Sequence, residues 1–322
     1  MEAITAEVTT KGKSARVPAV SIGTRSVLSQ GTWLKTAQIF DELWLDAPPL
    51  EDPEEFIGAL KRTGLSADLF TFGQMLPETK PKYSYHLEWD NLAVSPTSDF
   101  ESWWTALPQE SRKNVRKSQK RGVSVTTVDF GDELVHGIKA IYDETPVRQG
   151  RRFWHYGKDL ETVRQQNSSY LDRSQFIGAF LDRELIGFLK MVYVGPTARI
   201  MQILSMNRHL DKHTTNALLA TAVECCSKRP VSHLIYGQYV YGNKRNSSVT
   251  EFKRRNGFHE VLLPRYYLPL TWKGKLALST GLHRGISDVL PEPLINFLLD
   301  TRSFVYDRLL RLRSSRAVAN DS

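Results

Sequence analysis

Residues 246–258 read Asn-Ser-Ser-Val-Thr-Glu-Phe-Lys-Arg-Arg-Asn-Gly-Phe, and this short segment says more about the architecture than any other part of the chain. Polar capping residues at its start and a glycine near its end predict a short helix that stops at Gly257. Val249 and Phe252 lie three residues apart, so we expect them on the inner face of this helix. Lys253–Arg255 would give its last turn a positive charge.

Strand-like apolar runs stand on both sides of this helix, and an antiparallel meander joined by tight turns precedes them. The expected strands are Phe176–Leu181, Leu185–Val194, Arg199–Met206, Leu234–Tyr241 and His259–Leu270. Between the third and fourth strands, Thr214–Lys228 has an apolar face at helical spacing. This order predicts an α/β (α+β) fold, in which helices flank a mixed sheet.

The domain organisation follows from where these patterns begin and end. Residues 1–20 are polar and without periodicity, and we expect them to be disordered. Residues 21–164 hold shorter strands and a basic helix, which predicts an N-terminal lobe of less regular pattern. Residues 165–272 form the better-defined lobe. Residues 273–322 are expected to form a helical C-terminal extension.

The charge of the 322-residue chain is +8 overall and is unevenly distributed. Residues 1–100 hold 9 Lys/Arg against 14 Asp/Glu, a net charge of −5, so the remaining residues carry 34 against 21, a net charge of +13. A positive excess of this size favours an anionic partner: a phosphate-bearing cofactor, RNA or a membrane surface. The charge alone does not choose among them.

The composition, 41% hydrophobic and 24% charged, is typical of a globular protein, and no run of 18 apolar residues is present to cross a bilayer. The N-terminus lacks the apolar core of a secretory signal. Cys225 and Cys226 are neighbours in a predicted helix, where their side chains point apart, so no structural disulfide is expected. We therefore expect a cytoplasmic protein, with a peripheral position at the inner membrane face as an alternative.

Three stretches resemble a known superfamily. They are Trp104-x-x-Leu107-x-x-x-x-Arg112-x-Asn114-x-x-Lys117, Thr215-Asn216-Ala217-Leu218-Leu219 and Phe252-Lys253-Arg254-Arg255-Asn256-Gly257. Their order and spacing are similar to those of the GNAT superfamily of acyltransferases. The likeness is greatest to its Fem-type branch, which comprises peptidoglycan aminoacyltransferases and their acetyltransferase relatives.

This resemblance implies two fused GNAT-like lobes, the N-terminal one degenerate, and the transfer of an acyl group to an amine by direct attack. The implied cosubstrate is acyl-coenzyme A, and Lys253 aligns with the tyrosine that often protonates the departing thiolate in that superfamily. The glycine-rich pyrophosphate loop of ordinary acetyltransferases should lie near Asn207–Thr215, which contains no glycine. An aminoacyl-tRNA donor therefore stays open as an alternative.

The predicted donor site lies at the start of the helix that follows the central strand. Free N–H groups and the helix dipole favour an anion there. The residues expected to bind the donor are Lys212, His213, Thr214, Thr215 and Asn246. The alternative is that Thr214 or Thr215 only caps the helix.

The predicted catalytic residues are Lys253 and His155. The Lys253 ammonium would stabilise an oxyanion or hold a phosphate, and otherwise it belongs to a solvated basic turn. His155, in a loop of aromatic and basic residues, would be a general base or a structural residue. The acceptor is expected to contact Arg112, Arg148, Arg151, Trp154, Tyr156, Tyr239 and Tyr241. Core packing is the alternative for the last two tyrosines.

Two basic helical segments leave other partners open. Residues 111–121 place Arg112, Arg116 and Lys120 on one face, which suits RNA or membrane phosphates, or only a solvated surface. Residues 293–312 alternate leucine with arginine, as in a helix that lies on an anionic membrane or docks on its own core.

We expect the acceptor to be a small molecule or a cell-envelope precursor with an amine. A non-catalytic GNAT-like scaffold that binds RNA or anionic lipid is the rival interpretation. No metal site is predicted, because the sequence has neither a His-x-x-x-His nor a Cys-x-x-Cys pair.

Overall fold

The computed structural model describes residues 4–10, 13–46, 50–148, 150–242 and 247–284. Within them, twelve strands form one mixed sheet in the order β1-β2-β3-β4-β5-β14-β6-β13-β12-β11-β10-β7. The strands of this sheet are β1 (Ile4–Thr10), β2 (Lys13–Ile22), β3 (Arg25–Gln30), β4 (Thr36–Ile39), β5 (Leu69–Gly73), β6 (His86–Pro96), β7 (Ser124–Val128), β10 (Ser174–Leu181), β11 (Glu184–Val194), β12 (Thr197–Ser205), β13 (His233–Gln238) and β14 (His259–Pro269). A small hairpin, β8 (Val147–Arg148) and β9 (Arg151–Arg152), stands apart.

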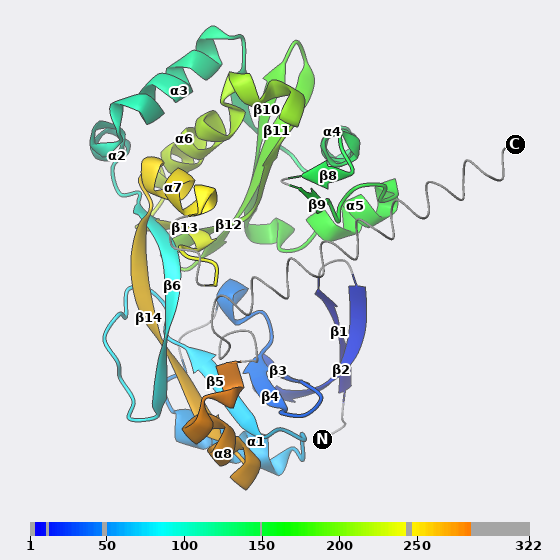
Figure 1. Ribbon diagram of the computed structural model, residues 1–322, viewed down its shortest axis with the longest axis vertical. Coiled ribbons are helices and arrows are strands. Elements are labelled where there is room, and N and C mark those ends of the chain that lie inside the picture. The colour runs from blue at the N-terminus through cyan, green and yellow to red at the C-terminus, as the bar shows by residue number, and fades with distance from the viewer. Residues whose placement is uncertain (1–3, 11–12, 47–49, 149, 243–246, 285–322) are drawn as a thin grey trace, which may run out of the picture.

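Helices cover both faces of the sheet in the second half of the chain, with α6 on one face and α4 and α5 on the other (Figure 1). The α-helices are α1 (Pro53–Arg62), α2 (Phe100–Ala106), α3 (Gln109–Lys120), α4 (Asp132–Asp143), α5 (Leu160–Asn167), α6 (Thr214–Ser227), α7 (Ser248–Arg255) and α8 (Trp272–Thr280). Short 3-10 helices are η1 (Glu42–Trp44), η2 (Leu171–Arg173), η3 (Asn207–Lys212) and η4 (Leu282–Arg284).

The two halves of the sheet repeat one strand order. In the first lobe β2, β3 and β4 form an antiparallel meander, and β4 then pairs in parallel with β5 across the helix α1. In the second lobe β10, β11 and β12 form the meander, and β12 pairs in parallel with β13 across α6. The chain therefore consists of two lobes of the same plan, and the first has fewer helices.

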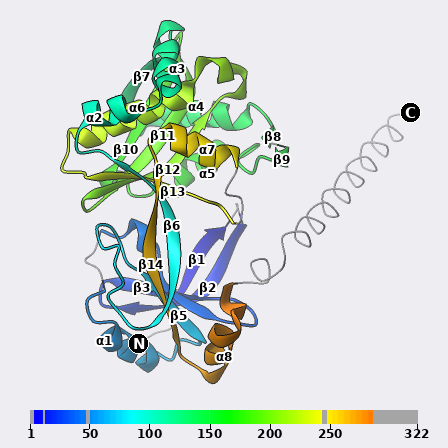
Figure 2. The same cartoon turned by 60° about the vertical axis from the view of Figure 1, so that its left-hand side comes forward.

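Each lobe is completed by a strand from the other. The long strand β6 follows the first lobe in sequence but pairs with β13, whereas β14 follows the second lobe and pairs with β5. β6 and β14 also pair with each other along nine residues, and Figures 1 and 2 show them running from one lobe to the other. This exchange joins the lobes through backbone hydrogen bonds.

The hydrophobic cores correct the lobe boundary that we expected at residue 164. One core unites α2, α3 and α4 with β10, β11 and α6, so the helices between residues 100 and 164 belong to the second lobe. A separate core lies under β3, β4, β5 and α1, and it includes Tyr266 and Leu268 of β14. The sequence could not show that these helices belong to the second lobe, because this depends on which hydrophobic core the apolar face of each helix packs against.

The N-terminal residues also differ from expectation. Residues 1–20 were predicted to be disordered, but β1 and β2 form an antiparallel hairpin from Ile4↔Ala19 to Thr10↔Lys13. The alternation of small, branched and polar residues in this region suits a strand that pairs at a sheet edge. The helices expected after residue 285 lie outside the described residues.

The helix α7 begins and ends as the sequence predicts. Ser247 caps its start by accepting from the Thr250 amide at 3.1 Å, and Gly257 follows its end with φ of 81°. Its inner face was predicted only in part. Phe252 is half-buried and packs against the hydrophobic core, as expected, but the buried residues of α7 are Thr250 and Lys253. Polar residues thus join Phe252 on the inner face of α7.

Gly257 is also in close contact with α2. A Cβ atom at this position would lie 2.6 Å from Trp103 Nε1 and 3.2 Å from Leu107 Cδ2. We expect Gly257→Ala to lower the free energy of unfolding by about 2–4 kcal/mol, from backbone strain and overpacking together. Gly64→Ala is the matched control, because Gly64 has φ of 73° and no atom within 4 Å of its Cβ position.

The control should cost only about 1 kcal/mol, the strain of the left-handed backbone alone. Urea denaturation of the two variants measures both values. Equal losses in the two variants would show that the contact with Trp103 contributes nothing.

Candidate functional site

The site is built where β12 and β13 separate. Their parallel pairing covers Thr197↔His233, Ala198↔Leu234 and Arg199↔Ile235, although β12 continues to Ser205 and β13 to Gln238. Both strands are irregular at this level. Met201 is an extra residue in β12 opposite β11, and the pairing of β13 with β6 shifts between Ile235 and Gln238.

Bulges bend the strands that contain them, so two bulges at one level explain why these neighbours diverge. In β13 the irregularity contains Gly237, whose φ is 58° and whose Cβ position lies 2.8 Å from Tyr241 Oη. A residue with a side chain would be both strained and crowded there. Gly237 therefore fixes the point at which β13 turns away.

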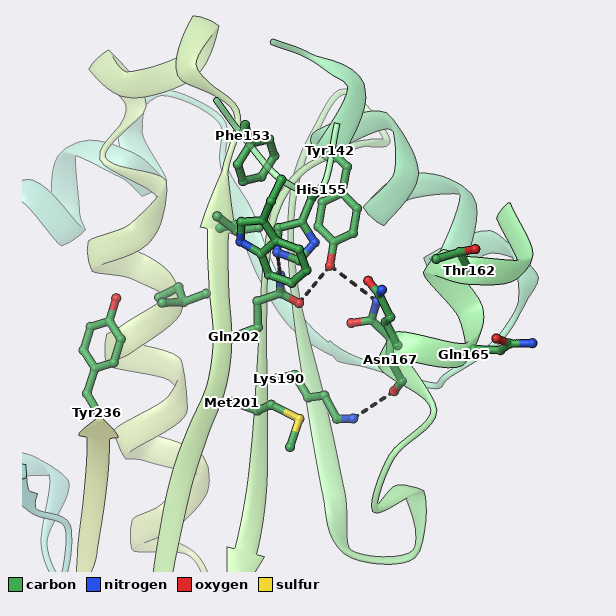
Figure 3. Close-up of a pocket in the computed structure, with 14 residues that line it drawn as sticks. Tyr142, Phe153, His155, Thr162, Gln165, Asn167, Lys190, Met201, Gln202 and Tyr236 are labelled. Atoms are coloured by element: carbon green, nitrogen blue, oxygen red, sulfur yellow. Dashed lines mark hydrogen bonds between the residues drawn. The ribbon is translucent and has the colours of Figure 1, made fainter. Parts of the chain in front are cut away.

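The separated strands border an open pocket of about 990 Å³ in the second lobe (Figure 3). Its wall combines β12, the last turns of α4 and α5, the loop after β9, and Tyr236 of β13. The lining residues are Tyr142, Phe153, Trp154, His155, Thr162, Gln165, Gln166, Asn167, Lys190, Met201, Gln202, Ile203, Leu204 and Tyr236. Aromatic rings and amides dominate this wall, and none of the described residues that line it carries a carboxylate.

A chain of polar contacts orders the wall. The Tyr142 hydroxyl donates to Gln202 Oε1 at 2.9 Å and accepts from Asn167 Nδ2 at 3.4 Å (Figure 3). The Gln202 amide nitrogen lies 3.1 Å from His155 Nε2. Because an amide N–H can only donate, His155 Nε2 accepts, and the proton of the neutral imidazole is on Nδ1.

His155 is held neutral in this wall. Its ring centroid lies 4.1 Å from that of Tyr142 and 3.5 Å from that of Trp154, with the ring planes tilted by 36° and 35°, and His155 is only 6% exposed. Burial, with Lys158 and Arg148 nearby, lowers the pKa of His155 to about 3. So weak a base takes up no proton near neutral pH, so the geometry favours the structural alternative for this residue over general-base catalysis.

Lys190 brings a positive charge to the pocket wall. Its ammonium donates to Asn167 O at 2.8 Å, Ser169 O at 2.6 Å and Ser169 Oγ at 3.1 Å, and burial lowers its pKa to about 8. All of these acceptors are neutral. Lys190 therefore fixes the turn after α5 to the sheet and leaves its charge without a carboxylate partner in the pocket wall.

Lys253 lies next to the pocket but outside its lining. It is fully buried, its ammonium donates to Gln238 O and lies 3.4 Å from Tyr241 Oη, and burial lowers its pKa to about 8. The ammonium also lies over the Tyr236 ring, 4.6 Å from its centroid. The Tyr236 ring therefore separates the Lys253 ammonium from the gap between β12 and β13. Because Lys253 is buried, it does not belong to a solvated basic turn, which was the alternative prediction.

The predicted donor residues surround the start of α6, but their side chains differ in orientation. Thr214 is buried against Gly187 of β11, so its hydroxyl does not point to solvent. Thr215 lies closer to the gap, with its hydroxyl 3.2 Å from that of Ser205 at the end of β12. Lys212 pairs with Asp211 at 3.7 Å.

His213 adopts the left-handed conformation that begins α6, with φ of 54°. Burial and the charges of Lys117 and Arg121 lower its pKa. At the start of α6, the basic residues Lys117, Arg121 and Lys212 therefore meet the acidic residues Glu110 and Asp211. Asn246, the fifth predicted donor residue, lies outside the described residues.

Two of the predicted acceptor arginines are bonded within the protein. Arg148 donates to Ser205 O at 3.0 Å and to Glu144 Oε2 at 3.2 Å, and so fastens the loop after α4 to the end of β12. Arg112 donates to Thr105 O at 2.6 Å and thereby joins α3 to α2. Neither lines the pocket, so both position the helices around it.

Of the remaining predicted acceptor residues, one lines the pocket and the others do not. Trp154 lines the pocket and is 48% exposed, whereas Arg151 and Tyr156 are exposed outside it. Tyr239 and Tyr241 were expected on one strand, but β13 ends at Gln238 and neither residue lines the pocket. Tyr236 takes their place, because the positive φ of Gly237 ends the strand early.

The sequence analysis missed Lys190, Gln202 and Gly237. The first two had a visible signal, since each is a polar residue in an otherwise apolar strand that should be buried on both faces. Gly237 also had one, because an isolated glycine in a strand often marks a bulge.

Neither comparison of the sequence, with family models or with curated proteins, gives a match. Among solved structures, FemX has a TM-score of 0.52 at 11% identity, over 86% of this chain and 89% of FemX. The C-terminal domain of a protein named as a lysylphosphatidylglycerol synthetase from Agrobacterium fabrum has a TM-score of 0.51 at 12% identity, over 83% and 89% of the two chains. L-PGS from Bacillus licheniformis has a TM-score of 0.51 at 13% identity, over 80% and 86%.

Together with the strand order of both lobes, these likenesses confirm the predicted GNAT-like fold, a mixed sheet flanked by helices. At such low identity they concern the fold alone. Across the described ranges, no helix combines the length and apolar character that a membrane crossing requires.

The protonation state of the His155 imidazole can be measured directly. We expect its imidazole to stay neutral from pH 8 to pH 5, because its pKa is lowered to about 3. The unfolded chain takes up a proton near pH 6.5, so His155 should contribute a loss of stability as the pH falls from about 6.5 toward 3. Imidazole NMR, assigned with His155→Gln, reports the titration. A midpoint near 6.5 would contradict the buried, neutral ring.

Proposed function

We propose that the protein is a transferase that moves an acyl group from a phosphate-bearing donor, in the first place acyl-coenzyme A, to an amine acceptor. The observation that supports this most is the separation of β12 from β13 after Arg199↔Ile235. Beyond that point the backbone groups of β12 and β13 do not hydrogen-bond to each other, and the two facing strand edges border a pocket of about 990 Å³. An extended donor arm can pair with such an edge as an added strand would.

The donor's phosphates would lie where α6 begins. Free N–H groups at a helix start favour an anion, and Lys117, Arg121 and Lys212 lie at this place together with Glu110 and Asp211. Thr215, next to the end of β12, is the predicted donor residue nearest to the gap. From there the donor's acyl end would reach the pocket between the strands.

The acceptor would enter the pocket as a neutral amine. Lys190 and Lys158 stand in or beside the wall, and the lining contains no carboxylate that would favour an ammonium ion. Nearby positive charge and burial both lower the pKa of an amine. The pocket therefore favours the deprotonated, nucleophilic form of the acceptor without a strong general base.

The reaction needs no nucleophile from the protein. The amine lone pair forms the new N–C bond at the acyl carbon, and the carbon's bond to the donor sulfur or oxygen then breaks. The leaving atom takes the electron pair and a proton, and the nitrogen gives up its proton. The Lys253 ammonium, one ring behind the gap, would lower the energy of the negative charge that develops in this step.

Aminoacyl-tRNA is the second candidate donor, and two observations favour it. The segment between β12 and α6 contains η3 instead of a glycine-rich loop. In addition, α3 exposes Lys113, Arg116, Lys117 and Lys120 next to this junction, as phosphate-backbone contacts require. One structural neighbour is named for a lysyl group joined to phosphatidylglycerol, so a lipid or cell-envelope acceptor belongs in the test.

A thermal-shift panel of acyl-coenzyme A species and charged tRNA tests the proposal, because a donor that binds the folded form raises the Tm by mass action. We expect one donor class to raise the Tm and to release its leaving group faster when amines are added. Binding to uncharged RNA or anionic vesicles, with no donor effect, would instead support the non-catalytic scaffold.

Lys253 can be tested by its charge. Lys253→Met should reduce turnover about 100-fold, the scale for losing one group that stabilises developing charge, and should change the Tm little because a buried ammonium is costly to desolvate. Arg254→Met, on the exposed side of α7, is the matched control and should retain turnover.

The pH profile separates this role from a structural one. Wild-type turnover should fall as the pH rises through about 8, where Lys253 loses its proton. Lys253→Arg should move this fall to higher pH, because arginine keeps its charge. An unchanged profile in Lys253→Met would remove Lys253 from the mechanism.

A further inference from the structure

A second cluster of chemically active side chains lies in the first lobe, far in sequence from the pocket. His86 and Glu88 are two residues apart on β6, and His283 stands on η4. Their ligand atoms all lie within 4.8 Å of one another. Glu88 Oε1 is 2.6 Å from His283 Nε2 and 3.7 Å from His86 Nε2.

The hydrogen bonds of His283 leave a conflict at this point. Its Nδ1 lies 3.3 Å from Ala277 O, and because a carbonyl can only accept, Nδ1 carries a proton. In a neutral imidazole, Nε2 then presents a lone pair to Glu88 Oε1. Two acceptors at 2.6 Å repel each other unless a cation stands between them. A metal ion between the two atoms, or a proton that they share, removes this repulsion.

The geometry of the cluster suits a metal ion. The His283 side chain is 1% exposed, so its ring is enclosed by the surrounding protein. His86 Nε2 lies 3.7 Å from the same carboxylate oxygen, so three potential ligand atoms converge on one point. A backbone acceptor on the far nitrogen, as Ala277 O is for His283, is also the usual partner of a metal-binding histidine.

We propose that His86, Glu88 and His283 form a binding site for a divalent transition-metal ion, with Zn²⁺ as the ion that best suits two imidazoles and one carboxylate. In a tetrahedral Zn²⁺ site with bonds near 2.0 Å, ligand atoms are separated by about 3.3 Å. The measured separations of 2.6 and 3.7 Å lie on either side of this value. Three protein ligands leave the fourth position for water.

Arg284 competes for the same carboxylate. Its Nε donates to Glu88 Oε1 at 2.7 Å. A metal ion at this oxygen would compete with the guanidinium, which can move to the second carboxylate oxygen. Arg284 therefore weakens metal binding without belonging to the ligand set.

The location suggests what the ion does. η4 directly follows α8, which packs on β14, and β14 pairs with β6 at Tyr267↔His86. A metal ion would fasten η4 to β6, a strand shared by both lobes. The site is therefore a structural clamp, independent of the transferase proposal. Sequence patterns could not predict it, since His283 lies 195 residues after Glu88.

Calorimetric titration of ZnCl₂ into the full, untagged, chelator-treated chain tests the proposal. We expect saturable binding of one ion per chain and a higher Tm with Zn²⁺. His86→Ala, Glu88→Gln and His283→Ala should each weaken binding at least about tenfold. His86 is exposed, so His86→Ala should fold even if His283→Ala does not.

Two matched variants separate this site from metal binding by surface histidines in general. His136→Ala removes an exposed histidine outside the cluster and should leave the affinity unchanged. Arg284→Ala removes the competing cation and should strengthen binding. Absence of saturable binding in the wild type, or equal affinity in wild type and His86→Ala, would overturn the metal site and leave an ion-pair cluster.

Discussion

The parting of two parallel strands is the constraint on which the rest of this structure depends. Once β12 and β13 diverge, the facing edges of both strands lose their ladder partners, and unpaired backbone groups away from water each cost about 1–3 kcal/mol. Such a gap persists only if it is open to water or filled by a ligand. The pocket beside it is open, and its amide and aromatic wall offers both polar and stacking contacts.

The gap keeps its shape because each strand is held on its other side. β12 stays paired with β11, and β13 is held by β6, the strand that the first lobe contributes. Above the gap, Asn216 of α6 donates to Asn256 at the end of α7 at 2.8 Å, and Ser111 of α3 donates to Arg255 O at 2.5 Å. The exchange of strands between lobes therefore stabilises the site as well as the fold.

Local patterns in the sequence were sufficient for most of the second lobe. The bounds of α6 were predicted to within one residue, and the glycine after α7 marked its end because only local backbone geometry was involved. The first lobe was harder, since the hairpin β1–β2 and the exchange of β6 for β14 depend on pairings between distant residues. The inner face of α7 was predicted incompletely for a different reason. An apolar pattern cannot reveal that a buried lysine faces inward.

For the candidate site, too, local features were predictable and contacts between distant residues were not. The sequence placed the candidate site at a helix start, a loop and two strands, but it did not show which side chains would be used in contacts within the protein. Arg148 and Arg112 looked like substrate residues and instead bind backbone carbonyls. Lys190 lay in an apolar strand and received no role, yet it places charge in the pocket wall. Bonds between distant elements decide such outcomes, and no local spacing encodes them.

The most direct test of the account fills the gap. Met201 is the extra residue of β12 and lines the pocket beside the gap, with Sδ 3.5 Å from Ser169 Oγ, so Met201→Trp should fill much of this pocket. Leu276→Trp, at a surface position of α8 that is 51% exposed and outside the pocket, is the control. Titration calorimetry with acetyl-coenzyme A and charged tRNA should show a donor that binds the wild type and the control, and binds Met201→Trp at least about tenfold more weakly. Equal affinity in all three proteins would contradict the claim that donors bind between these strands.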